Sequence, residues 1–316
     1  MRKHIITKDE GNWRDIDRFL LSVDSTGSFS KIGCNLALAI SLASARAGTK
    51  NQLWRITEEQ NPAVPVPIGR IISGKQGGAS DWMEFLAVPQ NPVNPYKTIK
   101  MLIDFWSLVG EILKERNALI GKDLSHSWMT RLDNQKTLSL LKQLSSDYDL
   151  RLGVNFGAHR LWNGKNYAYR KEGKNLSKKM HFNLVLETAR KYRLYYLEDP
   201  FHHSDFQAYK RLERELGKKC IIAGNKMYYN NIKNAGRIMA KKPGNAAVLT
   251  PSNLGLLSTM ERFAGVAKKN QLSLVCSGSY IEPSDHWLSD LAIAFSCPLI
   301  KTSITGPDII KHNRLI

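Results

Sequence analysis

The sequence predicts an α/β protein built on a closed barrel of strands. Its clearest element is Leu194–Phe201, an apolar and aromatic run that ends in Glu198, Asp199 and Pro200. Such a run indicates a buried strand whose carboxyl end opens into a polar site. Similar runs, separated by segments of helix length, recur at 220–225, 246–250, 272–277 and 299–302. This alternation predicts parallel βαβ units, and so many in succession predict a TIM-like barrel.

Polar residues that follow barrel strands face the functional site of such folds. We therefore expect Glu198 to lie in a site at the carboxyl ends of the strands. The alternative is that Glu198 only caps a turn, because barrel strands often end in polar residues.

Length and hydropathy narrow the class of protein. A chain of 316 residues favours one large domain with a small appendage. The sequence has no apolar run of eighteen residues, so we expect no membrane span. The first ten residues lack an apolar signal core, which predicts a cytoplasmic protein.

Four cysteines are scattered along the chain, at Cys34, Cys220, Cys276 and Cys297. Each has apolar or small neighbours, which is typical of reduced packing residues. A zinc site would need short spacings of the CxxC type, and these are absent from the sequence.

The chain is strongly basic, with a formal net charge of +18. Such an excess favours polyanion partners or anionic ligands. Its lysines gather at 171–179, 218–219, 241–242 and 268–269, where loops or helix ends are expected and a solvated basic face is the ordinary explanation. No recognised nucleic-acid module accompanies the charge.

The first 62 residues predict a helical segment. Residues 12–24 carry apolar side chains at helical spacing, and Gly33–Ala47 is a second helix of small residues that ends at Gly48. The proline-rich run Pro62–Pro67 then favours an extended path into the barrel. We therefore place a helical appendage at 1–62 and the barrel at 63–316.

The remaining elements follow in order along the barrel domain. The first two strands are expected over 66–72 and 83–89, with a flexible glycine-rich loop between them, and a further strand is expected over 151–156. The turn at 163–166 predicts a short excursion from the barrel over 167–170. Helices are expected over 98–117, 136–146, 178–192, 205–215, 230–241, 255–270 and 284–295.

The order of motifs resembles enolase, the phosphopyruvate hydratase of glycolysis, from about Asp9 to the end of the chain. The motifs are KIGCNLALAISLA at 31–43, VPVP at 64–67, MEFLAVP at 83–89, LEDPF at 197–201, NLG at 253–255, SDLA at 289–292 and LIKT at 299–302. This resemblance implies an enolase-type barrel whose early strands depart from the parallel pattern. It also implies a shortened capping domain, without the family's N-terminal three-stranded sheet and mobile serine-bearing loop.

The resemblance places the family's three magnesium ligands at Asn155, Glu198 and Asn225. Two of these positions have become amides, which removes two negative charges from a site whose affinity depends on ligand charge. Lys226, where the family usually has another aspartate, adds a repelling positive charge. We therefore expect magnesium binding to be weak or absent.

The acid and base of the family's reaction are also altered. The lysine base that removes a proton next to the substrate carboxylate corresponds to Thr250, which cannot serve as that base. The loop that bears the family's acid maps near Gly121–His126 and has no equivalent glutamate. Glu84 and Lys301 are the retained positions with a catalytic role in the family.

Two further positions correspond to substrate-binding residues of the family. Lys75 stands where the family has a histidine in the glycine loop, and Ser277 begins the segment that replaces a Ser-His-Arg-Ser phosphate loop. Alternatively, the retained Glu84, Glu198 and Lys301 only stabilise one another across a barrel mouth without its metal. His202 and His203 are adjacent in a loop, so we expect them to point apart and to form no replacement metal site.

Three functional hypotheses remain open. The sequence favours a non-catalytic enolase homologue, a pseudoenzyme that binds an anionic metabolite, a protein or a polyanion. The first alternative is an active phosphopyruvate hydratase, or a related lyase, with a rearranged site. The second is a nucleic-acid-binding protein that uses its basic surface. A separate protein chain that covers the shortened N-terminal region, against the exposed face of Gly33–Ala47, is a further candidate partner.

Overall fold

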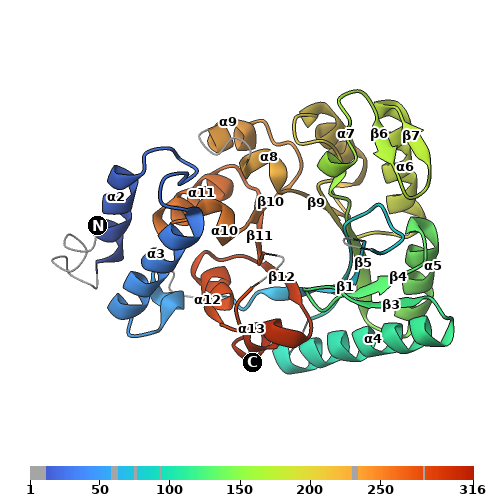
Figure 1. Cartoon of the computed structure of the whole chain (residues 1–316), viewed down its shortest axis with the longest axis horizontal. Coiled ribbons are helices and arrows are strands. Elements are labelled where there is room, and N and C mark those ends of the chain that lie inside the picture. Colours follow the sequence, from blue (N-terminus) through green and yellow to red (C-terminus); the bar gives the residue numbers. More distant parts are fainter. Residues whose placement is uncertain (1–11, 58–62, 75–76, 93, 230–233, 280–281) are drawn as a thin grey trace.

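The computed structural model describes residues 12–57, 63–74, 77–92, 94–229, 234–279 and 282–316. Eight strands close a barrel that is seen end-on in Figure 1, and the last strand pairs back onto the first. In barrel order they are β1 (Val66–Ser73), β2 (Glu84–Pro89), β5 (Leu150–Asn155), β8 (Tyr196–Glu198), β9 (Ile221–Gly224), β10 (Ala246–Leu249), β11 (Ser273–Ser277) and β12 (Leu299–Ser303). The α/β barrel predicted from the sequence is confirmed.

One strand of the barrel runs against the others. β2 pairs antiparallel with both β1 and β5, whereas the remaining neighbours in the barrel pair in parallel. The reversed direction brings Glu84, the first residue of β2, opposite Asn155, the last residue of β5. A residue that begins its strand therefore reaches the same end of the barrel as residues that finish theirs.

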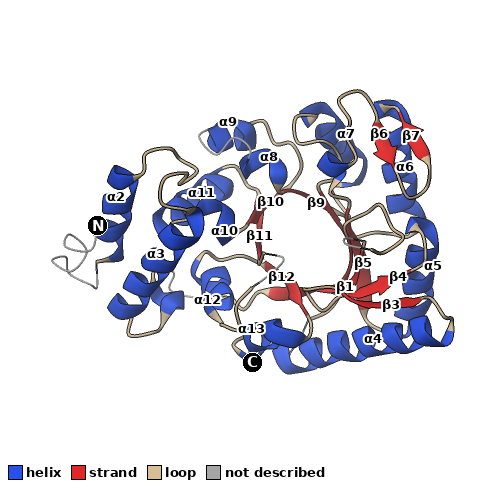
Figure 2. Cartoon of the chain, in the orientation of Figure 1, coloured by secondary structure: helices blue, strands red, loops and turns tan. Residues whose placement is uncertain are grey.

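Helices surround the barrel on its outer side (Figure 2). They are α4 (Pro95–Glu115), α5 (Asn134–Leu144), α6 (Lys178–Lys191), α7 (Phe206–Leu216), α8 (Lys226–Tyr229), α9 (Ala235–Ala240), α10 (Pro251–Leu254), α11 (Leu257–Lys269), α12 (Trp287–Ala294) and α13 (Ile309–Asn313). Short 3-10 turns lie at Leu53–Arg55, Ser145–Asp147, Ala158–Arg160 and Gly306–Asp308. Among the described residues, no helix is long and apolar enough to cross a membrane.

Two helices precede the barrel, α2 (Trp13–Val23) and α3 (Cys34–Gly48), and both were predicted. They lie against α10 and α11 on one flank of the barrel (Figure 1). The side chains of Asp17 on α2 and Ser41 on α3 accept the backbone N–H groups of Ser258 and Leu257 at the start of α11. Because the N-cap residue of α11 makes no side-chain cap bond, the N-terminal helices provide this cap from outside the helix.

Several element boundaries differ from the prediction for local reasons. α4 begins at Pro95 rather than residue 98, because Asn94 caps it and proline fits the first helical turn. α12 begins at Trp287 rather than residue 284, since the Asp285 carboxylate accepts the Trp287 N–H just before the helix. Of the helix predicted over 230–241, Ala235–Ala240 is helical, and 230–233 lie outside the described residues.

Two small hairpins extend the fold. β3 (Leu119–Lys122) and β4 (Trp128–Thr130) pair with each other and attach to β1, and the sequence did not indicate them. β6 (Tyr167–Tyr169) pairs with β7 (Lys174–Leu176) in a separate sheet. The second hairpin is the excursion from the barrel that was predicted after the turn at 163–166.

Candidate functional site at the barrel mouth

The barrel interior is filled by a layer of apolar side chains. Its members are Ile68, Leu86, Val88, Tyr196, Ala223, Ala246, Val248, Val275 and Leu299. This layer packs the barrel interior, so the barrel is not a pore, as in other barrels of the class. Any site inside the barrel must therefore lie beyond it, toward one mouth.

Each of the eight strands adds one polar residue above this layer. Side chains alternate between the two faces of a strand, so the residue two positions nearer the mouth again points inward. These residues are Arg70, Glu84, Asn155, Glu198, Asn225, Thr250, Ser277 and Lys301, and all of them line one cavity of about 270 Å³. The structure thus brings together Glu84, Asn155, Glu198, Asn225, Ser277 and Lys301. Lys75 lies outside the described residues.

Glu198 is the centre of this polar layer and is fully buried. Its Oε2 atom lies 2.6 Å from Lys301 Nζ and accepts a hydrogen bond from Tyr196 Oη at 2.7 Å. Its Oε1 atom accepts from the amide nitrogens of Asn155 and Asn225, at 3.2 and 2.9 Å. A carboxylate offers about four acceptor positions, so the four contacts saturate it.

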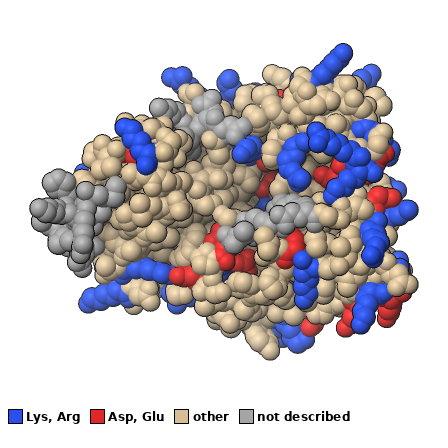
Figure 3. Space-filling view, viewed as in Figure 1, with Lys and Arg blue, Asp and Glu red and all other residues tan. Residues whose placement is uncertain are grey.

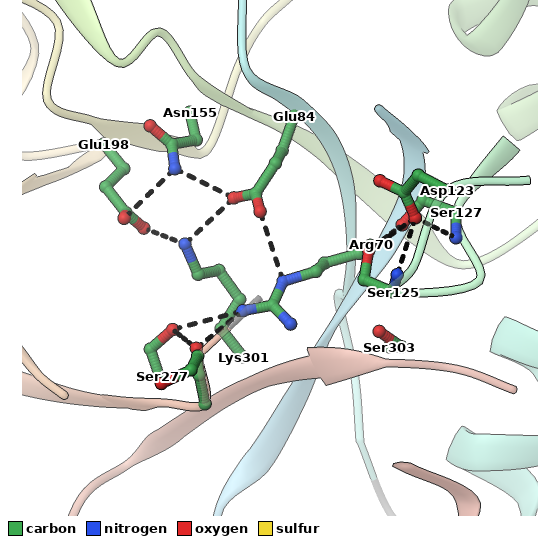
Figure 4. Close-up of polar contacts among 12 residues, drawn as sticks. Arg70, Glu84, Asp123, Ser125, Ser127, Asn155, Glu198, Ser277, Lys301 and Ser303 are labelled. Carbon is green, nitrogen blue, oxygen red and sulfur yellow. Dashed lines mark hydrogen bonds and ion pairs between the residues drawn. The ribbon is translucent and has the colours of Figure 1, made fainter. Parts of the chain in front are cut away.

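The amide of Asn155 is oriented by the backbone. Its Oδ1 atom accepts the N–H of Gly157 at 3.0 Å, which leaves the amide nitrogen directed at Glu84 and Glu198 (Figure 4). A flipped amide would place its nitrogen against that N–H donor and its oxygen against two carboxylates. Asn155 therefore presents hydrogen-bond donors to the site, where a carboxylate would present acceptors.

Arg70 is the site residue that sequence reasoning missed. It is only 3% exposed, its Nε lies 3.3 Å from Glu84 Oε1, and its Nη2 donates to the Gly278 carbonyl at 2.9 Å. Glu84 also lies 3.1 Å from Lys301. A signal was present, since Arg70 is the one charged residue in the strand predicted over 66–72.

The ionised residues of the polar layer balance in charge. Arg70 and Lys301 contribute two positive charges, and Glu84 and Glu198 contribute two negative ones. Each buried ion thus has an opposite partner inside the layer, as buried charges require. The mouth of the barrel carries no net charge from these four residues.

Asp199 and His159 form a second ionisable pair beside Glu198. Burial, and then the neighbouring Glu198 charge, raises the pKa of Asp199 to about 7. Burial, and then the charge of Lys226, lowers the pKa of His159 to about 4. The Asp199 carboxylate accepts the backbone N–H groups of Asn225 and Lys226, so it fixes the turn that follows β9.

The donor set does not fit a magnesium ion. Magnesium needs oxygen ligands in near-octahedral geometry, and of the three positions that the resemblance assigns to the metal only Glu198 is a carboxylate. Both oxygens of that carboxylate already accept from nitrogen or hydroxyl donors. Within the described ranges, no group of three or more His, Cys, Asp or Glu residues is arranged to hold a metal.

The other mapped positions lie in different settings. Thr250 lines the cavity, whereas the loop at 121–126 does not. Asp123 of that loop binds the backbone and hydroxyl of Ser125 and the N–H of Ser127, a local turn drawn beyond Arg70 in Figure 4. His202 and His203 do not line the cavity. The prediction that they point apart is wrong, because their ring centroids lie 3.9 Å from each other.

The fold and the polar layer define a mixed eight-stranded α/β barrel with its candidate site at one mouth. The sequence model described as "Enolase, C-terminal TIM barrel domain" matches residues 61–316. The enolase of Methanosphaera stadtmanae is 28% identical over 99% of this chain and 80% of that protein. The enolase of Pyrobaculum aerophilum is 30% identical over 95% of this chain and 75% of that protein. The chain belongs to the enolase family.

Proposed function

We propose that this chain is a non-catalytic member of the enolase family, in which direct contacts between side chains have replaced a metal. The observation that carries the proposal is the saturation of Glu198 by Lys301, Tyr196 and two amides. A divalent cation at this carboxylate would have to displace these donors. Asn155 and Asn225 lack the two negative charges that would compensate for the loss of these contacts.

The proton-transfer groups support the same proposal. Enolase chemistry needs a base for a carbon-bound proton and an acid for the leaving hydroxide. Thr250 stands at the position of the base, and the 121–126 loop lies away from the cavity. The chain thus lacks two of the metal ligands, the base and the acid, which are the kinds of group that the reaction uses. The effects of these losses on the reaction rate are not additive, because the groups act as one unit.

An active lyase that uses Lys301 as its base is the alternative. Lys301 lines the cavity, which favours this alternative. Its Nζ atom, however, lies 2.6 and 3.1 Å from two carboxylates that are almost completely buried. Lys301 would have to leave both contacts to reach a substrate carbon, and it would leave two buried carboxylates without that partner.

The test combines a titration and an activity assay on the full chain. Isothermal titration with magnesium is expected to give no heat of binding, and 2-phosphoglycerate is expected to remain unconverted at high magnesium. Turnover that disappears in Lys301→Ala or Glu198→Gln would overturn the proposal, because it would show a working site rebuilt around these residues. Lys97→Ala on the outside of α4 is the control for such a loss.

We propose that an anionic partner binds outside the cavity, and the charge balance of the polar layer supports this. Because the four ionised residues of the polar layer cancel, they give an anion no net attraction. The excess positive charge of the chain therefore has to lie elsewhere. We propose that anions meet the outer surface of the protein.

We also propose that a protein partner binds the exposed face of α3. Leu36, Ala39, Ala43 and Ala47 are exposed and recur at helical spacing along α3. A second polypeptide chain could cover this apolar face. Co-purification from the source cell with wild type but not with Ala43→Glu would support such a partner, and equal recovery with both would exclude this face.

A further inference from the structure

We infer that a basic surface beside the barrel mouth binds the phosphate backbone of nucleic acid. The surface is formed by residues 160–179, which contain one acidic residue, Glu172. Its basic residues are Arg160, Lys165, Arg170, Lys171, Lys174, Lys178 and Lys179. Seven positive charges less one negative charge give +6 within this segment, against +18 for the whole chain. This inference does not depend on whether the barrel is catalytic.

The fold presents this segment as a projection from the barrel. It leaves the barrel after β5, forms the β6–β7 hairpin and returns through the start of α6. All seven basic side chains are exposed. Figure 3 shows Lys and Arg side chains gathered beside the barrel mouth, on the side where β6, β7 and α6 lie in Figure 1.

Some of these charges are already paired, whereas others have no carboxylate partner in the part of the chain that the structure describes. Lys174 lies 2.9 Å from Glu172, and Lys178 lies 3.5 Å from Asp205. Lys171 donates to the carbonyls of Gly74 and Gly78 and so holds the hairpin against the β1–β2 loop. Among the residues that the structure describes, no carboxylate lies within ion-pair distance of Arg160, Lys165, Arg170 or Lys179.

Arg160 of this surface and Lys226 beside the barrel mouth both lie near His159. Burial, followed by the charges of Lys226 and Arg160, lowers the pKa of His159, which lies between the surface and Asp199. Lys226 is exposed and follows β9 directly. A chain of phosphates along this path would meet cations on the hairpin and again at the edge of the mouth.

The composition of the surface favours nucleic acid over a folded protein as the partner. Protein interfaces have an apolar centre and are depleted in lysine. Over 160–180, Met180 is the one large apolar side chain that is strongly exposed, at 55%. Lysine and arginine without such a centre are typical of phosphate contacts, which are insensitive to sequence.

Base stacking is not expected to contribute. Trp162 is the aromatic residue of the surface that is nearest to solvent, but it is half-buried. Its ring contacts Tyr167, His202 and the Lys178 ammonium, which lies 5.2 Å from the ring centroid. The ring faces are thus engaged within the protein, and binding should depend on charge.

The experiment measures binding of a fluorescent single-stranded oligonucleotide of about 20 nucleotides by anisotropy. Affinity is measured from about 50 mM to about 200 mM salt, without magnesium. The variant Arg160→Gln, Lys165→Gln, Arg170→Gln removes three exposed charges and no hydrogen bond or ion pair of these side chains that the structure shows. Its affinity at about 0.1 M salt is expected to fall on the order of 100-fold, and the slope of log affinity against log salt to decrease by about 2.

The matched control is Lys97→Gln, Lys114→Gln, Lys269→Gln, on α4 and α11, which changes the net charge equally. It is expected to change the affinity by no more than about threefold, since it lies outside the basic surface. Equal losses in both triple variants, or wild-type affinity that is independent of salt, would overturn the inference. Binding of polyglutamate as tight as that of the oligonucleotide would also overturn it, by excluding nucleic acid as the preferred partner.

Discussion

The ammonium nitrogen of Lys301 lies 2.6 Å from the Oε2 atom of Glu198, and both side chains are buried at the mouth of the barrel. Lys301 comes from the last strand of the barrel and Glu198 from the fourth, so the contact spans the interior. Glu84 from the second strand also contacts Lys301, at 3.1 Å. One ammonium thus joins strands that are far apart in the chain.

Lys301→Ala is expected to reduce the free energy of unfolding by about 3–5 kcal/mol, because it leaves buried carboxylates without a charge partner. Denaturation in urea at neutral pH measures the loss. Adding Glu198→Gln to Lys301→Ala should recover part of it, since one of the unpaired charges is then removed. Lys97→Ala on the surface of α4 should change stability by less than about 0.5 kcal/mol. A loss in Lys301→Ala below about 1 kcal/mol would contradict this structural role.

Asn155→Asp combined with Asn225→Asp is expected to create magnesium affinity. The two new carboxylates would surround Glu198 with negative charge, which destabilises the metal-free protein and favours a divalent cation. Magnesium at about 100 times its dissociation constant should then stabilise the double variant by about 2.7 kcal/mol. Thermal unfolding with magnesium chloride, against sodium chloride of equal ionic strength, measures the effect. Equal stabilisation of wild type and variant would show that the amides do not prevent binding.

His181 is expected to make stability depend on pH. It is fully buried, its Nε2 contacts the Pro200 carbonyl and its Nδ1 contacts the Tyr169 hydroxyl. Burial lowers the pKa of His181 from 6.5 to about 4, so the unfolded chain takes up a proton first as pH falls. The stability that neutral His181 provides is therefore present above pH 6.5 and is lost as pH falls toward about 4.

The change His181→Gln tests this pH dependence. The stability difference between wild type and variant should shrink by about 3 kcal/mol from pH 6.5 to pH 4. Urea denaturation across this pH range measures it. A difference that is constant with pH would mean that His181 titrates alike in both states.

Asp17→Ala and Ser41→Ala are each expected to destabilise the protein by about 0.5–2 kcal/mol, the range for loss of a helix cap. Each side chain accepts an N–H from the start of α11. Ser22→Ala, an exposed serine of α2, is the control and should have an effect below about 0.5 kcal/mol. Denaturation followed by circular dichroism measures all three variants. Unchanged stability in both cap variants would mean that these two hydrogen bonds do not stabilise α11.

Local pattern was sufficient to predict most elements of this fold. Apolar runs that end in polar residues located the strands around Glu198, Asn225, Thr250, Ser277 and Lys301, because a buried strand must be apolar until it reaches the mouth. The β3–β4 hairpin was missed. Its strands are short, their residues are half exposed, and their stability depends on pairing with β1 rather than on a periodic pattern of their own.

By itself, the sequence determined the barrel class and the positions of most strands, since these follow from patterns within a few residues. Its resemblance to a known family pointed to most of the residues at the barrel mouth. Only the tertiary structure decided how these residues meet. The register of β2 and β5 sets Glu84 beside Asn155, and the Gly157 N–H orients the Asn155 amide toward two carboxylates. Arg70 acquired its place through contacts with Glu84 and Gly278, which are distant in the chain. Charge pairing and the partners of the buried side chains depend on such distant neighbours, and no local pattern records them.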